Sequence, residues 1–271
     1  MRQAIDVSHY EDKEYNLPLL RSKGIEMLCA KATQGDYLTD DRYKYFIEGS
    51  RAVGMFNGGF HFFDPERDPI GQINYYLNYT SLFSPVDFNC LDVEREYVWK
   101  LVKTAKDKAG TWQKVIIDGN ALDASIHAAW NYLKSRSPKV VMYSRISWID
   151  EFCPQMWKWV RDEPLWLAQY PDDKDRTKMT ISEDVAYLAE IERIKGTFFK
   201  TGRANNVILM QFCQYYKTAG MGNSTDLNLI FDEAKYDRWA GKVVIPPVTT
   251  PVIDRLPAFL QKLQELVKAY E

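Results

Sequence analysis

Short apolar runs recur along the chain, and longer helical or polar segments separate them. Several runs are apolar on both faces, as in Met27–Ala30, a pattern typical of parallel strands that are covered on both sides. We therefore expect nine strands, in the regions Ala4–Val7, Glu26–Ala32, Gly58–Phe63, Phe88–Val93, Val115–Ile117, Val140–Tyr143, Leu165–Tyr170, Val207–Phe212 and Leu227–Ile230.

Helical spacing of apolar residues marks most of the segments between these runs. In Leu122–Leu133, for example, Ile126, Ala129 and Trp130 fall on one face of a helix. We expect helices at Tyr15–Arg21, Asp41–Ala52, Ile70–Leu82 and Leu122–Leu133. Strands and helices that alternate in this way predict an α/β barrel or a doubly wound sheet.

The chain length and the number of strands leave the domain count open. A chain of 271 residues suits one large domain or two of ordinary size. Nine strands are one more than a barrel of eight needs, and Val115–Ile117 has the weakest pattern. We expect this run in an insertion.

The segment after residue 242 differs from the rest of the chain. Residues 243–256 contain Pro246, Pro247 and Pro251 with neighbouring threonines, and they predict an extended linker. Residues 257–271 predict an amphipathic helix whose apolar face carries Phe259, Leu260, Leu263, Leu266, Val267 and Tyr270. Two interpretations stay open: the helix packs on the main domain, or it associates with a partner or a second copy of the chain.

Composition and charge exclude several classes of protein. Lysine and arginine total 35 and the acids total 37, so the net charge of −2 gives no overall basic surface for nucleic acid. The chain contains neither a GxGxxG nor a Walker A sequence, which argues against nucleotide chemistry. Aromatic residues make up 14% of the chain, and they either fill a core or form platforms for ring-shaped ligands.

Cysteine and histidine usage gives no sign of a metal centre. The four cysteines form no CxxC pair, and the three histidines are scattered along the chain. We expect buried free thiols in a reducing compartment, no metal site and no cofactor. The first residues, MRQAIDVSHY, lack the apolar region of a Sec signal, and no segment approaches the ~18 apolar residues of a membrane span.

The most informative candidate chemistry lies at the end of the run Phe88–Val93. Asp92 and Glu94 are two residues apart there, so their side chains point to the same side of a strand. In α/β barrels the C-terminal ends of the strands form the catalytic face. Two carboxyl groups held close together do not both ionise readily, so we expect one raised pKa, which suits a general acid near neutral pH.

Polar and aromatic residues lie at the ends of other predicted strands as well. They include Asp6, Ser8, His61, Trp166, Tyr170, Gln211 and Asp226. If the strands form one barrel, these side chains converge on one mouth. Acids with aromatic residues, without metal ligands or a phosphate loop, are typical of glycoside hydrolases.

Eight short motifs span the chain from Ile5 to about residue 230. They are Ile5–Ser8, Ala30–Gly35, Gly58–Phe63, Leu91–Glu94, Val141–Ser144, Leu165–Tyr170, Met210–Phe212 and Thr225–Asn228. In this order they resemble the motifs of glycoside hydrolase family 25, the Chalaropsis-type muramidases of bacteria, fungi and phage endolysins. The resemblance implies an irregular TIM-like (β/α)5(β)3 barrel, here at residues 1–242.

The resemblance also implies an activity and a site. The activity is hydrolysis of the β-1,4 bond between N-acetylmuramic acid and N-acetylglucosamine in bacterial peptidoglycan, without a cofactor. Glu94 matches the proton donor, and Asp92 matches a partner that stabilises positive charge on the sugar or orients its acetamido group. Asp6 and Asp226 match the two further acids. The implied sugar-binding residues are Tyr143, Trp166, Tyr170, His61, Phe63 and Gln211, and for Tyr143 and Trp166 packing inside the barrel is equally open.

The sequence departs from the family pattern at three motifs. Gln34 stands where the family usually has Glu, Phe60 where it has Tyr, and Met210 where it has Trp. Segments 95–118 and 171–205 are longer than usual and are expected beside the mouth of the barrel. The second segment contains a predicted helix at 182–194.

Two other functions stay open on the sequence alone. A degenerate barrel that binds cell-wall glycan without cutting it, as a structural or virion component, would suit the altered motifs. A hydrolase of another N-acetylated glycan would share the Asp-x-Glu pair. We favour the muramidase, made without a Sec signal in the cytoplasm of a phage-infected bacterium and acting on the cell wall after release.

Overall fold

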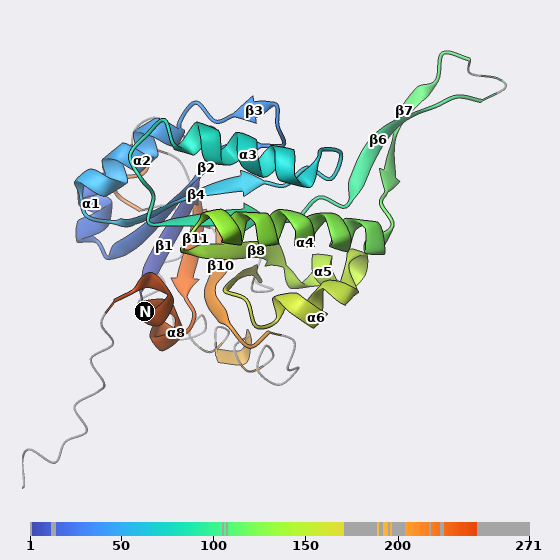
Figure 1. Cartoon of the computed structure of the whole chain (residues 1–271). Coiled ribbons are helices and arrows are strands. Elements are labelled where there is room, and N and C mark those ends of the chain that lie inside the picture. The colour runs from blue at the N-terminus through green and yellow to red at the C-terminus, as the bar shows by residue number, and fades with distance from the viewer. Residues whose placement is uncertain are drawn as a thin grey trace, which may run out of the picture.

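Eight strands form a closed barrel at the centre of the computed structural model of the chain (Figure 1). The structure describes residues 2–11, 15–104, 106, 108–170, 189, 192–194, 196, 204–216, 218–222 and 225–242. The barrel strands are β1 (Gln3–Val7), β2 (Ile25–Gln34), β4 (Phe56–Phe62), β5 (Phe88–Asp92), β8 (Val140–Arg145), β9 (Leu165–Ala168), β10 (Val207–Tyr216) and β11 (Thr225–Ile230). The short strand β3 (Leu38–Thr39) pairs with the end of β2.

The direction of the strands distinguishes β11 from the other seven. From β1 through β10, neighbouring barrel strands are parallel, beginning with the pairing of β1 with β2. β11 runs antiparallel to both of its neighbours, β10 and β1. The barrel, and not the doubly wound sheet, is therefore confirmed, with the predicted (β/α)5(β)3 arrangement.

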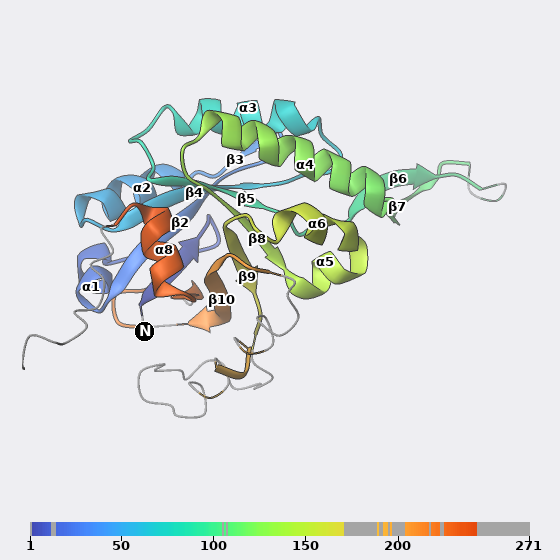
Figure 2. The same ribbon diagram turned by 60° about the horizontal axis from the view of Figure 1, so that its bottom comes forward.

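Helices coat the outside of the barrel (Figures 1 and 2). Four of the predicted helices are confirmed as α1 (Leu17–Ser22), α2 (Tyr43–Ala52), α3 (Pro69–Thr80) and α4 (Gly119–Arg136). Asp68 and Asp118 begin α3 and α4, because each carboxylate accepts hydrogen bonds from backbone N–H groups of the first turn. Four short elements were not predicted: α5 (Ile146–Phe152), the 3-10 turn Pro154–Met156, α6 (Trp157–Val160) and α8 (Glu233–Ala240).

The barrel strands are buried on both faces, as the apolar runs indicate. On β4, His61 contacts Gln72 of α3 on the outer side. Phe60 and Phe62, its neighbours in sequence, point into the barrel. Since successive residues of a strand point to opposite faces, one strand supplies both the core under the helices and the wall of the barrel.

Helix α8 closes the end of the barrel at which the parallel strands begin. Its Trp239 ring lies 5.6 Å from Phe56 and 5.1 Å from Phe88, and its Nε1 donates a hydrogen bond to the Val140 carbonyl at 3.0 Å. These three partners are the first residues of β4, β5 and β8. A Cβ atom at Gly58 would collide with the Phe88 ring, so glycine leaves room for this packing. The polar side chains therefore gather at the opposite end.

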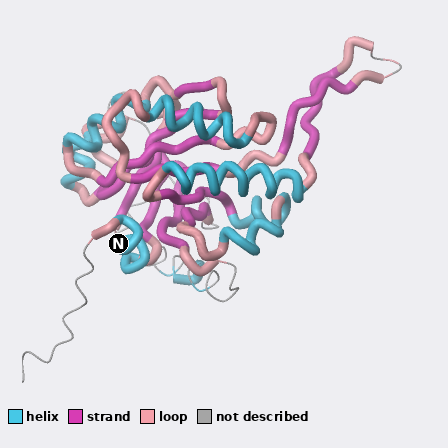
Figure 3. The backbone as a smooth tube through the Cα atoms, in the orientation of Figure 1, coloured by secondary structure: helices cyan, strands magenta, loops and turns pink. Residues whose placement is uncertain are grey.

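A two-stranded hairpin stands away from the barrel (Figures 1 and 3). Its strands β6 (Tyr97–Val102) and β7 (Thr111–Ile116) pair with each other and form a separate sheet between β5 and α4. The assignment of Val115–Ile117 to an insertion is confirmed. The structure adds β6, which the sequence pattern did not reveal.

Several predicted features lie outside the described residues. They are the linker at 243–256, the helix at 257–271, and most of segment 171–205 with its helix at 182–194. The extent of the domain, 1–242, stays a prediction. Within the described residues, no helix combines the length and the apolar character that a membrane crossing requires. All four cysteines are buried thiols, as predicted.

Replacing Trp239 with alanine tests the closing role of α8. The variant loses the ring that covers Phe56 and Phe88, and we expect the free energy of unfolding to fall by about 3 kcal/mol. The control Trp112→Ala removes the same side chain from the hairpin, where it is 63% exposed, and is expected to change stability by ~0.5 kcal/mol or less. Urea unfolding followed by circular dichroism measures both, and equal losses would contradict this role.

Candidate active site

The polar end of the barrel holds a cavity of about 210 Å³. It lies at the C-terminal ends of the parallel strands, and the start of β11 reaches it because β11 runs in the opposite direction. Its walls include the carboxyl groups of Asp6, Asp92, Glu94 and Asp226. The structure therefore brings all four predicted acids together. Among the described residues, no group of three or more His, Cys, Asp or Glu side chains is arranged to hold a metal ion.

Asp6 and Asp226 form a carboxyl pair across two strands. The register of β1 and β11 sets the two residues opposite each other, and their side chains are hydrogen-bonded. Burial raises the pKa of Asp6 to about 7, and burial together with the Asp6 carboxyl raises the pKa of Asp226 to about 10. A buried pair of this kind shares a proton at neutral pH and carries one negative charge instead of two.

The side-chain amide of Gln211 holds this pair in place. Its Nε2 donates to both Asp6 oxygens, at 3.0 and 2.9 Å, and to Asp226 Oδ2 at 3.0 Å. Its Oε1 accepts hydrogen bonds from the hydroxyl of Tyr143, at 2.7 Å, and from that of Tyr170. Because an amide does not ionise in this range, Gln211 keeps the same donors and acceptor whatever the charge of the pair.

Asn228 extends this network to an aromatic wall. Trp166 Nε1 donates to Asn228 Oδ1 at 2.7 Å, and Asn228 Nδ2 donates to Asp6 Oδ2 at 3.3 Å. The Tyr143 ring packs edge-on against Trp166, with ring centroids 5.3 Å apart. Both rings line the cavity and also belong to the packed interior of the barrel. Barrel packing and a place beside a ligand are therefore compatible for these two residues.

Asp92 and Glu94 enter the cavity from the end of β5. Asp92 is buried, and its Oδ1 has no hydrogen-bond partner among the described residues. Burial and the Glu94 carboxyl raise the pKa of Asp92 well above its ordinary value, against the opposing charge of Lys31. Burial also raises the pKa of Glu94, and the charges of Arg145 and Lys31 offset only part of this effect. The pair holds a proton to higher pH than free carboxyl groups would, as a general acid requires.

Two cations that sequence reasoning missed lie beside these acids. Arg145 Nε is 3.6 Å from Glu94 Oε2. Lys31 Nζ lies 5.0 Å from the centre of the Phe62 ring, and burial lowers the pKa of this amine. The signal was present, because Arg145 is two residues after Tyr143 on the same strand face and Lys31 is part of one of the eight motifs.

Three of the six predicted sugar-binding residues do not line the cavity. Tyr170 contacts Gln211 of its wall, whereas His61 and Phe63 lie away from it. His61 is fully buried on the outer face of β4, with its Nε2 3.0 Å from Gln72 Oε1. Burial lowers its pKa to about 4. Phe63 is buried in the core between the strands and the helices. The structure brings neither residue to the cavity, and Phe60 and Phe62 line it instead.

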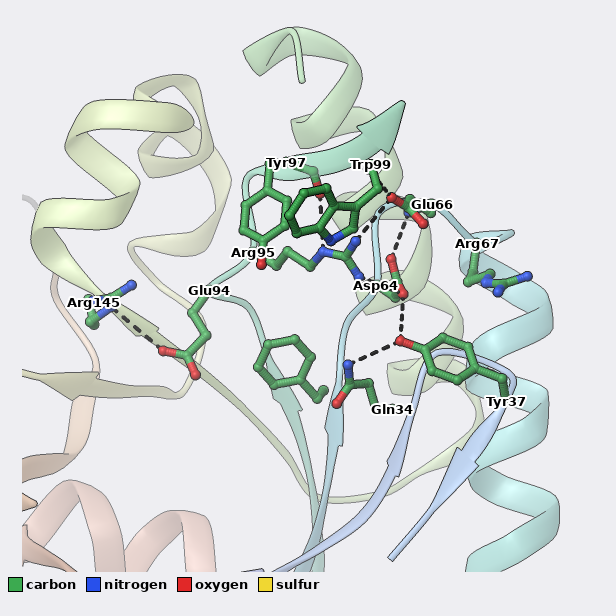
Figure 4. A pocket seen from close by; sticks show the side chains of 11 residues that line it. Gln34, Tyr37, Asp64, Glu66, Arg67, Glu94, Arg95, Tyr97, Trp99 and Arg145 are labelled. Carbon is green, nitrogen blue, oxygen red and sulfur yellow. Dashed lines mark hydrogen bonds and ion pairs between the residues drawn. The ribbon is translucent and has the colours of Figure 1, made fainter. Parts of the chain in front are cut away.

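A second cavity, of about 570 Å³, opens beside the first (Figure 4). Glu94 lines both cavities and so lies at their boundary. Tyr97 and Trp99 of the hairpin form one wall, and Arg95 beside them pairs with Asp64 at 2.8 Å (Figure 4). The insertion therefore reaches the candidate site, as expected from the sequence.

Sequence comparisons relate the chain to known proteins. The family profile described as Glycosyl hydrolases family 25 matches residues 5–187. The autolytic lysozyme of Clostridium acetobutylicum is 24% identical over 155 residues, which cover 56% of this chain and 40% of that protein. The chain thus spans less than half the length of this curated relative.

Solved structures share the fold at low sequence identity. The lysozyme from Streptomyces coelicolor has a TM-score of 0.63 and 16% identity, covering 89% of this chain and 97% of that one. The muramidase from Acremonium alcalophilum has a TM-score of 0.60 and 13% identity, covering 89% of this chain and 100% of that one. The likeness extends over most of the chain and supports the same closed barrel.

The variant Asp226→Asn tests the shared proton. Because the pKa of Asp226 in the folded chain lies above its ordinary value of 3.8, the folded chain binds this proton more tightly than the unfolded chain. The free energy of unfolding of the unmodified chain is therefore expected to fall as the pH rises from about 4 toward 10. In the variant, an amide donates permanently to Asp6, so we expect greater stability near pH 8, by about 1–3 kcal/mol, and little difference near pH 4.

Urea unfolding at several pH values measures this difference. The control Asp41→Asn removes a carboxylate that is 82% exposed, and its effect should vary little with pH. A stability difference for Asp226→Asn that is equally large near pH 4 and near pH 8 would rule out the shared proton.

Proposed function

The chain belongs to family 25 of the glycosyl hydrolases, and we propose that it hydrolyses the β-1,4 bond between N-acetylmuramic acid and N-acetylglucosamine in bacterial peptidoglycan. The observation that carries this proposal is the convergence of four carboxyl groups on one cavity, two of them at the end of a single strand. The names of the related proteins, an autolytic lysozyme and a muramidase, support the same substrate. The place of action is then the cell wall.

Glu94 is the proton donor in this proposal. Its side chain is 29% exposed, and it lies where the two cavities meet. A glycan strand that crosses this boundary would set one glycosidic oxygen beside Glu94. The raised pKa keeps the proton on the carboxyl group until the leaving oxygen takes it.

Asp92 acts on the sugar that develops positive charge. It is more deeply buried than Glu94, and its Oδ1 is free of hydrogen bonds from the described residues. This oxygen is therefore available to accept a hydrogen bond from an acetamido N–H group or to face the cationic sugar. The Asp6–Asp226 pair adds one negative charge to the same cavity, which stabilises an oxocarbenium-like transition state.

Aromatic side chains form surfaces inside the cavity on which sugar rings can pack. Phe60, Tyr143 and Trp166 line it, and the apolar C–H faces of a sugar pack well on such rings. Tyr170 donates its hydroxyl hydrogen bond to Gln211. Its proposed role is to orient that amide and, through it, the acid pair.

Substituting Glu94 with glutamine tests the proton donor. The amide keeps the shape of the side chain but cannot give up a proton, so we expect the release of reducing ends from peptidoglycan to fall at least ~10²-fold. The control Glu48→Gln changes an exposed carboxylate of α2 and should retain full activity. Circular dichroism should match the unmodified chain in both variants. Full activity in Glu94→Gln would exclude this residue as the donor.

Arg145→Met tests the electrostatic control of Glu94. The substitution removes the charge that lies 3.6 Å from Glu94 Oε2 and lowers the pKa of this carboxyl. Without it the pKa of Glu94 rises, so the alkaline limb of the pH profile of kcat/KM should move to higher pH. Arg161→Met, which removes a guanidinium paired with Asp162, serves as the control. A limb that stays in place or moves to lower pH would contradict this assignment.

A further inference from the structure

The hairpin β6–β7 presents two faces with different chemistry. Directly opposed residues of an antiparallel pair lie on the same face, so the strand register sorts the side chains. One set, which we call the aromatic face, consists of Tyr97, Trp99, Leu101, Trp112, Lys114 and Ile116. The opposite face carries Val98, Lys100, Val102, Thr111, Gln113 and Val115.

Exposed apolar side chains concentrate on the aromatic face. Trp99 is 46% exposed, Leu101 42%, Trp112 63% and Ile116 55%. These four are half of the eight large hydrophobic side chains that are exposed in the described part of the chain. Contiguous exposed apolar patches mark binding surfaces, and a hairpin alone in water is only marginally stable. We therefore expect a ligand to cover this face.

The aromatic face continues a wall of the candidate site. Tyr97 and Trp99 lie at the base of the hairpin, with ring centroids 5.9 Å apart, and line the larger cavity with Glu94 (Figure 4). Leu101 and Trp112 form a cross-strand pair farther along the hairpin. At ~3.3 Å per residue, the four steps from Tyr97 to Leu101 extend this wall by roughly 13 Å.

The charge of the hairpin favours an anionic polymer. Residues 97–116 contain five lysines and one aspartate, a net charge of +4, whereas the whole chain carries −2. Lys114 belongs to the aromatic face, with its Nζ 4.1 Å from the centre of the Tyr97 ring and 5.6 Å from that of Trp99. Peptidoglycan combines sugar rings, which stack on aromatic side chains, with the carboxylates of its peptide stems, which attract ammonium groups. The aromatic face carries both kinds of partner, aromatic rings for the sugars and the Lys114 ammonium group for the carboxylates.

We propose that the aromatic face binds the peptidoglycan strand beyond the bond that is cut, as an extension of the substrate site along the hairpin. This inference rests on the proposed function. The occupant is the glycan strand, and not a lipid surface or a second copy, because the face continues a cavity that contains the proposed proton donor. A strand that leaves Glu94 through the larger cavity meets Tyr97 and Trp99 first and Trp112 farther out.

The test measures binding to insoluble peptidoglycan by a chain that cannot cut it. Glu94→Gln is combined with Trp112→Ala or with Gln113→Ala and sedimented with purified sacculi from which teichoic acid has been removed. Gln113 is the neighbour of Trp112, is also exposed and lies on the opposite face, so it provides the matched control. We expect about tenfold weaker binding with Trp112→Ala and unchanged binding with Gln113→Ala.

The outcomes separate this inference from the proposed function. Equal binding by the two double variants, while the unmodified chain releases reducing ends from the same sacculi, overturns the inference alone. Absence of released ends overturns the proposed function. Trp112-dependent binding to vesicles of phosphatidylglycerol, without Trp112-dependent binding to sacculi, would assign the face to a lipid surface and also overturn the inference. Self-association that Trp112→Ala abolishes, with unchanged binding to sacculi, would do the same in favour of a second copy.

Discussion

The candidate site depends on how the barrel closes. β11 lies antiparallel beside β1, and this pairing sets Asp226 opposite Asp6 although the two residues are far apart in the sequence. The Gln211 amide from β10 then bonds both carboxyl groups and two tyrosine hydroxyls. These bonds join β1 to β8, β10 and β11. The contacts that hold these strands together therefore also fix the acids at the mouth of the barrel.

Burial of these acids lowers the stability of the folded chain and also suits the acids to catalysis. Asp6, Asp92 and Asp226 have little contact with water, so their ionised forms are disfavoured and their pKa values are raised. Such groups lower stability near neutral pH, and the aromatic packing around Trp239 at the other end of the barrel contributes apolar burial that offsets the loss. The same burial keeps a proton available for catalysis and strengthens electrostatic interactions in the cavity.

Local patterns in the sequence predicted the eight barrel strands, the main helices and the Asp92–Glu94 pair, because each depends on neighbouring residues. The choice between a barrel and a doubly wound sheet depended on the pairing of β1 with β11, which no local pattern contains. The family resemblance assigned His61 and Phe63 to the site, and because Gly58–Phe63 has aromatic residues at alternating and neighbouring positions, nothing in the run shows which face looks inward. Strand β6 is apolar except for Lys100, but none of its residues is buried, and it forms by pairing with β7, which its own sequence does not contain.

We propose that the four acids and the two joined cavities cut peptidoglycan at one kind of bond. Mass spectrometry of the fragments released from purified peptidoglycan tests it most directly, because each hydrolysed bond leaves a new reducing sugar. We expect N-acetylmuramic acid at every new reducing end. Fragments that end in N-acetylglucosamine, or strands that remain intact, would contradict it.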